Sequence, residues 1–159
     1  MAVEIERKFL LSGGHWRQDA GQAQLIRQGY LSDQPDRTVR VRVLGDQGWL
    51  TIKGRTQGIA RAEFEYPIPL ADAMQLLDQL CLQPLIEKQR YRIQYADLVW
   101  EVDEFFGQNT GLVVAEIELS SADQVFARPD WLGQEVSDDP RYFNSALIAR
   151  PYSTWSHAD

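Results

Sequence analysis

The chain is poor in the residues that build disulfides, membrane spans and basic surfaces. It has one cysteine, Cys81, among 159 residues, so no internal disulfide can form, and a reducing compartment suits it. No apolar run approaches the ~20 residues that a membrane-spanning helix needs. A formal net charge of −7 argues against broad binding to nucleic acid or to an anionic membrane. The first residues, Met1 to Glu4, hold no hydrophobic signal segment, and we therefore expect a cytoplasmic protein.

Histidine is nearly as scarce as cysteine. His15 lies near a predicted turn and His157 near the C-terminus, and neither has a recognisable triad or metal partner, so we expect both to be non-catalytic. Cys81 falls on the apolar face of a predicted helix and is expected in the core. Four of the five tryptophans are scattered without a basic stripe, which predicts packing rather than base stacking. These four are Trp49, Trp100, Trp131 and Trp155.

The sequence is rich in alternation with period two, which is the mark of β-strands. Strands are predicted near 3–11, 24–32, 37–44, 48–54, 60–68, 85–95, 98–106 and 112–119. Apolar residues recur at helical spacing over 71–82, and shorter helices are predicted at 122–127 and 143–149. Eight strands with few helices predict an α+β, mainly β, protein built as a closed or nearly closed antiparallel barrel. One domain is expected over residues 1–152, with a tail over 153–159.

The polar faces of these strands are unusual because they carry repeated charges. Residues i and i+2 on one strand face lie about 6.5–7 Å apart. Carboxylates at this spacing repel when poorly solvated and favour a bound Mg²⁺, Mn²⁺ or Ca²⁺. Paired Arg and Lys at the same spacing suit a chain of phosphates. The same-face groups are Glu4, Glu6 and Lys8; Arg40 and Arg42; Thr51 and Lys53; Arg61, Glu63 and Glu65; Lys88, Arg90 and Arg92; Glu101 and Asp103; and Glu116 and Glu118.

The alternation alone leaves two arrangements open. With the charged faces outside, the apolar faces would form an ordinary barrel core and the charges would lie in solvent. With the charged faces inside, the barrel would enclose a polar tunnel. Helix 71–82, loops or another subunit would then cover the apolar outer faces. Because exposed apolar patches often mark interfaces, a homodimer is possible.

The segment from Val3 to Phe9 resembles the N-terminal Glu-x-Glu-x-Lys signature of the CYTH superfamily, the triphosphate tunnel metalloenzymes, in its short bacterial type. Further matching segments follow in order at 38–42, 50–54, 63–65, 87–91, 101–103, 115–118 and 142–145. The resemblance implies an eight-stranded antiparallel closed β-barrel, the triphosphate tunnel fold, with a few peripheral helices and the charged faces inside. It also implies divalent-metal-dependent hydrolysis of a linear triphosphate, with Mg²⁺ or Mn²⁺ as the cofactor.

The resemblance assigns roles to the inward residues. Substrate binding is assigned to Lys8, Arg40, Arg42, Lys53, Lys88 and Arg90. Metal binding is assigned to Glu4, Glu6, Asp103, Glu116 and Glu118. Supporting positions are Glu63, Glu65, Glu101 and Arg92. The catalytic candidates are Lys8, Lys53 and Tyr30, although a ligand-facing role and a purely structural role are both open for Tyr30.

The chain is short and has no obvious region for recognising an organic group. This favours inorganic tripolyphosphate, cleaved to pyrophosphate and phosphate, as the substrate. A thiamine or nucleoside triphosphatase and a class IV-like adenylate cyclase stay open as other enzymes. A non-catalytic polyphosphate-binding module also stays open, because the same residues would bind and catalyse. We expect no nucleic acid or membrane partner.

Overall fold

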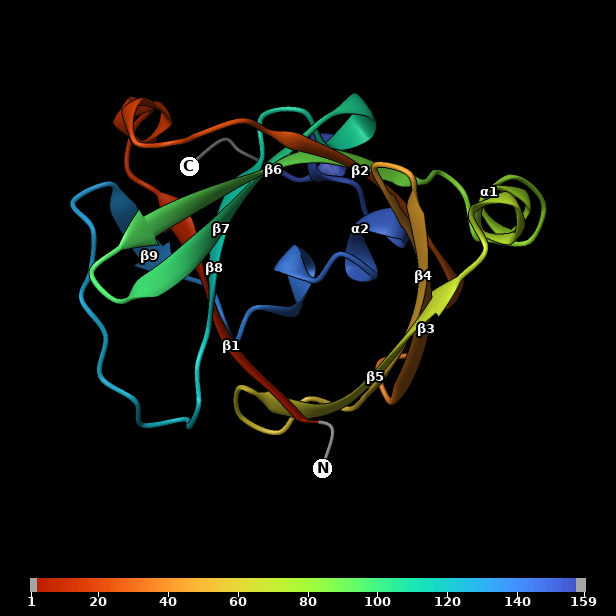
Figure 1. Ribbon diagram of the computed structural model, residues 1–159, viewed down its shortest axis with the longest axis horizontal. Coiled ribbons are helices and arrows are strands. Elements are labelled where there is room, and N and C mark those ends of the chain that lie inside the picture. The colour runs from red at the N-terminus through yellow and green to blue at the C-terminus, as the bar shows by residue number, and fades with distance from the viewer. Residues whose placement is uncertain (1–2, 157–159) are drawn as a thin grey trace.

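Alternating apolar and charged residues form eight antiparallel strands, and the pairing of the fifth strand with the first closes them into a barrel (Figure 1). The computed structural model describes residues 3–156. The strands run in the order β5-β4-β3-β2-β6-β7-β8-β1, and the predicted closed barrel is confirmed. Their bounds are β1 (Val3–Leu11), β2 (Gln24–Ser32), β3 (Arg37–Leu44), β4 (Gln47–Gly54), β5 (Ala60–Ile68), β6 (Ile86–Tyr95), β7 (Leu98–Phe105) and β8 (Val113–Glu118).

A ninth strand, β9 (Leu132–Glu135), extends the sheet beside β1. The first residues of β1 pair with β5, from Val3 to Ile5, whereas β9 pairs with β1 at Phe9 and Leu11. β9 was not predicted from the sequence, because its four residues are too few to establish an alternation. One edge of β1 therefore pairs with β5 at the start of the strand and with β9 at its end.

The apolar faces of the strands point outward, and other parts of the chain cover two regions of them. On one side, Phe9, Trp100 and Ile117 pack with Trp16 of η1 (His15–Gln18) and with Trp131 of the connection into β9. On another side, α1 (Leu70–Gln79) lies outside β3 and β4, where its Ala73 and Leu77 pack with Val41 and Cys81 (Figure 1). The polar faces must then point into the barrel, which decides between the two arrangements in favour of the tunnel.

The C-terminal part of the chain closes one end of the barrel. Here Leu147 and Ile148 of α2 (Ala146–Ala149) pack against Ile86, Phe105 and Val114, which lie at the same end of β6, β7 and β8. Figure 1 looks down the barrel and shows α2 inside the outline of the strands. The remaining short helices are η2 (Gly107–Asn109), η3 (Pro140–Tyr142) and η4 (Tyr152–Thr154).

Of the three helices predicted from the sequence, two are present and one is not. The helix predicted at 71–82 is α1, and the one predicted at 143–149 shortens to α2. The helix predicted at 122–127 is wrong, since this segment is a turn followed by extended chain. Local hydrogen bonds of Ser121 and Gln124 compete with helix formation there. Phe126 is drawn into edge-on contact with Phe9 and Trp100, which ties the loop to the barrel.

The division into a domain at 1–152 and a tail at 153–159 stays a prediction. Trp155 stacks edge-on against Tyr142 and Tyr152, with ring centroids 5.1 and 5.0 Å apart. The predicted non-catalytic His157 and the rest of 157–159 lie outside the described residues. Within residues 3–156, none of the helices is sufficiently long and apolar to cross a membrane.

Candidate functional site

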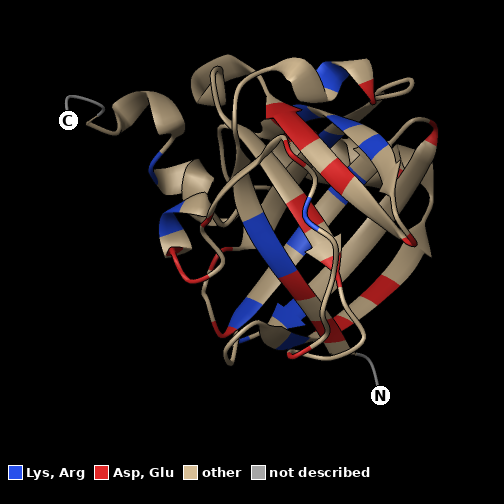
Figure 2. Ribbon diagram, turned by 90° about the vertical axis from the view of Figure 1, so that its left-hand side faces the viewer, with Lys and Arg blue, Asp and Glu red and all other residues tan. Residues whose placement is uncertain are grey.

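The inward faces of the strands enclose a cavity of about 590 Å³, which is within the range of small-molecule sites. All predicted site residues line it except Asp103, which is fully buried. The basic lining residues are Lys8, Arg40, Arg42, Lys53, Arg61, Lys88, Arg90 and Arg92. The acidic ones are Glu4, Glu6, Glu63, Glu65, Glu101, Glu116 and Glu118. Figure 2 shows that acidic and basic residues recur along the strands.

A basic arc from β3 contributes two guanidinium groups. Nη2 of Arg40 donates to Oγ1 of Thr51 at 3.1 Å and to Glu65 at 3.4 Å, while its Nε is buried without a partner among the described residues. Nε of Arg42 donates to Oε1 of Gln28 at 2.8 Å. Burial, with repulsion from Arg40 and Arg90, lowers the pKa of Arg42 to about 9. The arc therefore has donors and positive charge to offer an anion.

Two basic residues of β6 are held by one carboxylate of β7. Asp103 is fully buried and accepts hydrogen bonds from Arg90 through both of its oxygens, at 2.8 and 2.9 Å. Its Oδ2 also lies 2.8 Å from Nζ of Lys88. Burial would raise the pKa of Asp103, but Arg90 and Lys88 hold it far below its usual range. Burial lowers the pKa of Lys88 to about 7.

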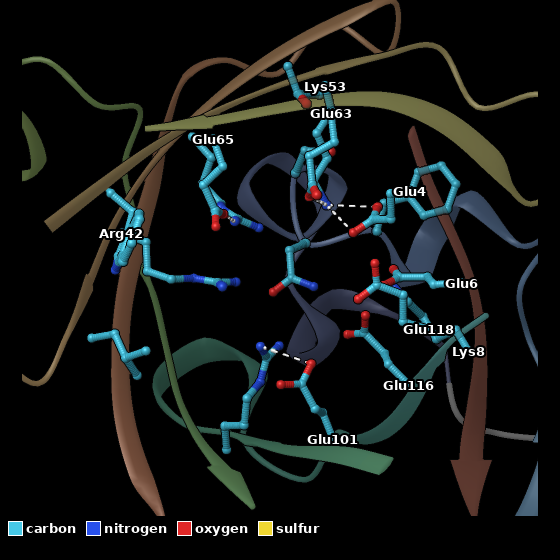
Figure 3. A pocket seen from close by; sticks show the side chains of 18 of the residues that line it. Glu4, Glu6, Lys8, Arg42, Lys53, Glu63, Glu65, Glu101, Glu116 and Glu118 are labelled. Carbon is cyan, nitrogen blue, oxygen red and sulfur yellow. Dashed lines mark hydrogen bonds and ion pairs between the residues drawn. The ribbon is translucent and has the colours of Figure 1, made fainter. Parts of the chain in front are cut away.

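The acidic side of the cavity is built from β1, β7 and β8. Glu6 stands directly opposite Glu118, and Glu101 stands directly opposite Glu116. Burial, with repulsion from Glu116 and Glu4, raises the pKa of Glu6 well above its usual value. Figure 3 shows Glu6, Glu116 and Glu118 directed into the space that Arg42 faces from the far side. Opposed like charges destabilise a strand pair unless something neutralises them.

Lys53 joins the acidic residues of β1 and β5. Its Nζ lies 3.0 Å from Oε1 of Glu4 and 3.3 Å from Oε2 of Glu63 (Figure 3). Burial would raise the pKa of Glu4, but Lys53 lowers it below the usual value. Arg61, which was not predicted, lies 3.4 Å from the same oxygen of Glu4. The sequence held a signal for Arg61, because it shares a strand face with Glu63 and Glu65.

The donor set fits a hard divalent cation. Carboxylate oxygens are what Mg²⁺ and Mn²⁺ prefer, and the raised pKa of Glu6 marks negative charge that a cation would stabilise. Residues 3–156 contain no preformed group of three metal-binding side chains. The basic and acidic side chains that line the cavity are also nearly equal in number, eight against seven, so the lining has little net positive charge to hold an anion. A polyanion would need additional positive charge to be held here.

Several residues line the cavity although their positions in the sequence did not predict it. Trp49, predicted as a packing residue, lines the cavity on the same face of β4 as Lys53. Phe143 and Asn144 line it from the C-terminal segment. Their inclusion had no periodic signal, because the segment is irregular. Tyr30, by contrast, lines the cavity as its strand face predicted.

The fold and cavity define a class: closed antiparallel barrels whose interior carries a basic arc facing an acidic one. Residues 2–152 match the family model of the CYTH domain, and the chain belongs to the CYTH family. An inorganic triphosphatase of Acetivibrio thermocellus is 50% identical over 155 residues, which cover 98% of this chain and 99% of that protein.

Two further comparisons agree with this membership. An inorganic triphosphatase of Nitrosomonas europaea is 35% identical over 149 residues, covering 91% of this chain and 96% of that protein. The solved structure of the inorganic triphosphatase NE1496 superposes with a TM-score of 0.63 at 34% identity, covering 91% of this chain and 96% of that one.

Proposed function

We propose that the chain is a divalent-metal-dependent triphosphatase that hydrolyses inorganic tripolyphosphate to pyrophosphate and phosphate. The observation that carries the proposal is the basic arc of Arg40 and Arg42 facing the acidic pair Glu6 and Glu118 across one cavity. The inorganic triphosphatases at 50% and 35% identity support the same substrate class.

The metal would be Mg²⁺ or Mn²⁺, held by carboxylates of β1 and β8. Glu6 and Glu118 are the first candidates because they stand opposite one another, with Glu116 and Glu4 beside them. Asp103 was predicted for the same role, but Arg90 and Lys88 occupy both of its oxygens, which favours a supporting role. When bound, the cation would neutralise phosphate charge and lower the pKa of a water molecule.

The basic side chains would bind the phosphates and stabilise the transition state. Hydrolysis of a phosphoanhydride demands mainly positioning and electrostatic stabilisation, so no protein nucleophile is required. Arg40 has a buried Nε without a partner among the described residues, and Arg42 forms no ion pair with a described carboxylate. Lys8, Lys53, Lys88 and Arg90 would add fixed positive charge around the bond that breaks. Tyr30 lines the same cavity and would contact the phosphates.

A substrate panel tests the proposal. Release of phosphate would be measured from tripolyphosphate, ATP and thiamine triphosphate, each with Mg²⁺, with Mn²⁺ and with EDTA. We expect tripolyphosphate to give the highest kcat/KM, with no turnover in EDTA. If cyclic AMP were the main product from ATP, the protein would be an adenylate cyclase and the proposed hydrolase activity would be wrong. Tight binding of tripolyphosphate without turnover under either metal would indicate a binding module.

The cellular setting is proposed from the sequence and the surface. We infer a cytoplasmic protein without nucleic acid or membrane partners, in keeping with its net charge of −7. A homodimer would use the outer faces of β4 and β5, where Ile52, Phe64 and Tyr66 are exposed. Light scattering of the purified protein would measure its oligomeric state.

A further inference from the structure

Two neutral amides hold two of the cavity's basic side chains. Oε1 of Gln28 accepts from Nε of Arg42 at 2.8 Å, and Oδ1 of Asn144 accepts from Nζ of Lys88 at 2.9 Å. Nε2 of Gln28 in turn donates to Oδ1 of Asn144 at 3.0 Å. The chain of contacts thus runs from Arg42 on β3 through Gln28 on β2 and Asn144 to Lys88 on β6.

The amide chain is built into the barrel. The side chain of Gln28 is fully buried, that of Lys88 is nearly so, and Asn144 lines the cavity from outside the strands. The same C-terminal segment also provides the carbonyl of Tyr142, which accepts from Nζ of Lys8 at 3.1 Å. The segment that closes the barrel end therefore supplies uncharged acceptors to two of the cavity's lysines.

The neutrality of these acceptors matters for anion binding. Carboxylates hold other basic groups of the cavity, as Glu4 holds Lys53 and Asp103 holds Arg90, and Asp103 is also the one carboxylate partner of Lys88 within residues 3–156. A carboxylate fixes a cation's position but cancels its charge toward a ligand. An amide oxygen fixes the position and leaves the positive charge available. Arg42 forms no ion pair with any carboxylate of residues 3–156, and its Nε donates to an amide oxygen instead.

We propose that Gln28 and Asn144 are positioning residues: Gln28 holds Arg42 without neutralising it, and Asn144 holds Lys88 without adding a second carboxylate to the one that Asp103 supplies. The cavity thereby keeps positive charge for a bound polyphosphate. This inference rests on the proposed function, since it assumes a polyphosphate ligand. It assigns to the irregular C-terminal segment a share in substrate affinity, in addition to its role in closing the barrel.

Two substitutions at one position separate charge from geometry. Asn144→Asp keeps the shape and the Oδ1 acceptor but adds a negative charge beside Lys88. Asn144→Ala removes the acceptor and adds no charge. If neutrality is the purpose, Asn144→Asp raises the KM for tripolyphosphate by about tenfold or more, and by more than Asn144→Ala does, because a unit charge a few ångströms from a polyanion acts strongly. If Asn144 only supports the fold, the isosteric variant is the milder of the two.

The matched control is Asn109→Asp. Asn109 is also buried and its Oδ1 accepts from the backbone N–H of Tyr152 at 2.8 Å, but it does not line the cavity. The same change of charge there should leave KM unchanged. Gln28→Glu provides a second route to the answer, and should also raise KM, should Asn144→Asp fail to fold.

The measurements are kcat and KM for tripolyphosphate with Mg²⁺, and the rise in melting temperature caused by a non-hydrolysable tripolyphosphate analogue with Mg²⁺. We expect Asn144→Asp to lose most of that rise, Asn144→Ala to lose part of it, and Asn109→Asp to retain it. A wild-type response in Asn144→Asp, or a larger loss in Asn144→Ala, overturns the inference alone. A wild-type protein that neither binds nor cleaves tripolyphosphate overturns the proposed function and the inference with it.

Discussion

Glu6 and Glu118 stand directly opposite each other on β1 and β8, with both side chains directed into the cavity. The pKa of each is raised, by burial first and then by neighbouring carboxylates. Such an arrangement destabilises the empty barrel. A metal ion bound near the two carboxylates would remove their repulsion, so we expect the pair to bind metal at the expense of the stability of the empty barrel.

Glu6→Gln should lower tripolyphosphate turnover by roughly 100-fold or more, because it removes a charged oxygen donor from the metal site. In EDTA the same variant should melt at the wild-type temperature or above it, since a repulsion is relieved. Phosphate release across a Mg²⁺ titration and a melting curve would measure the two effects. The exposed Glu87 of β6 supplies the control, Glu87→Gln. A variant with wild-type turnover would remove Glu6 from the metal site.

Arg40→Ala should weaken substrate binding more than it slows chemistry. The guanidinium of Arg40 has a buried Nε without a described partner, so an anion is the expected acceptor. Loss of a charge-assisted hydrogen bond predicts a KM higher by roughly 10-fold to 100-fold. Steady-state kinetics on tripolyphosphate would measure it, with Arg37→Ala as the control because Arg37 is exposed and pairs with Asp36. An unchanged KM would place the phosphates elsewhere.

Asp103→Asn should destabilise the fold. The substitution keeps the shape but leaves Lys88 and Arg90 without their shared carboxylate, and breaking a buried pair typically costs about 3–5 kcal/mol. Urea unfolding in EDTA would measure the loss, with Asp97→Asn in the exposed β6–β7 turn as the control. If stability is unchanged while the dependence on metal concentration shifts, Asp103 is a metal ligand as first predicted.

Gly48→Ala tests the packing of α1 on the barrel. A Cβ at this position would lie 2.7 Å from Cβ of Ala73 and 3.1 Å from the carbonyl oxygen of Ile68. Neither neighbour is a flexible side-chain end, so a loss of roughly 1–3 kcal/mol is expected. Gly14→Ala is the control, because no atom lies within 4 Å of the added Cβ. Equal unfolding free energies for the two variants would show that α1 can shift without cost.

The barrel could be predicted from the sequence because its cause is local. Each strand alternates two chemistries, as in Val39-Arg40-Val41-Arg42, and eight such segments leave few architectures open. The direction of the charged face is not local. It depends on what covers the other face, here Trp16, Trp131 and α1, and the family resemblance was needed to favour the inside.

The site divides in the same way. Residues on regular strands, such as Glu6 and Arg42, could be predicted from their faces and lie in the cavity. Asn144 could not, because it lies in an irregular segment that reaches the cavity through tertiary packing of Leu147 and Ile148. Asp103 shows a further limit. Its position on the inward strand face was predicted. Only the structure shows that its carboxylate is bonded to the side chains of Arg90 and Lys88.

Diffraction from crystals grown with Mn²⁺ and a non-hydrolysable tripolyphosphate analogue tests the central claim most directly. The account predicts an anomalous manganese peak beside Glu6 and Glu118, with phosphate oxygens between the metal and the guanidinium groups of Arg40 and Arg42. Manganese and phosphate bound outside the barrel, or a cavity that excludes both at saturating concentrations, would contradict it.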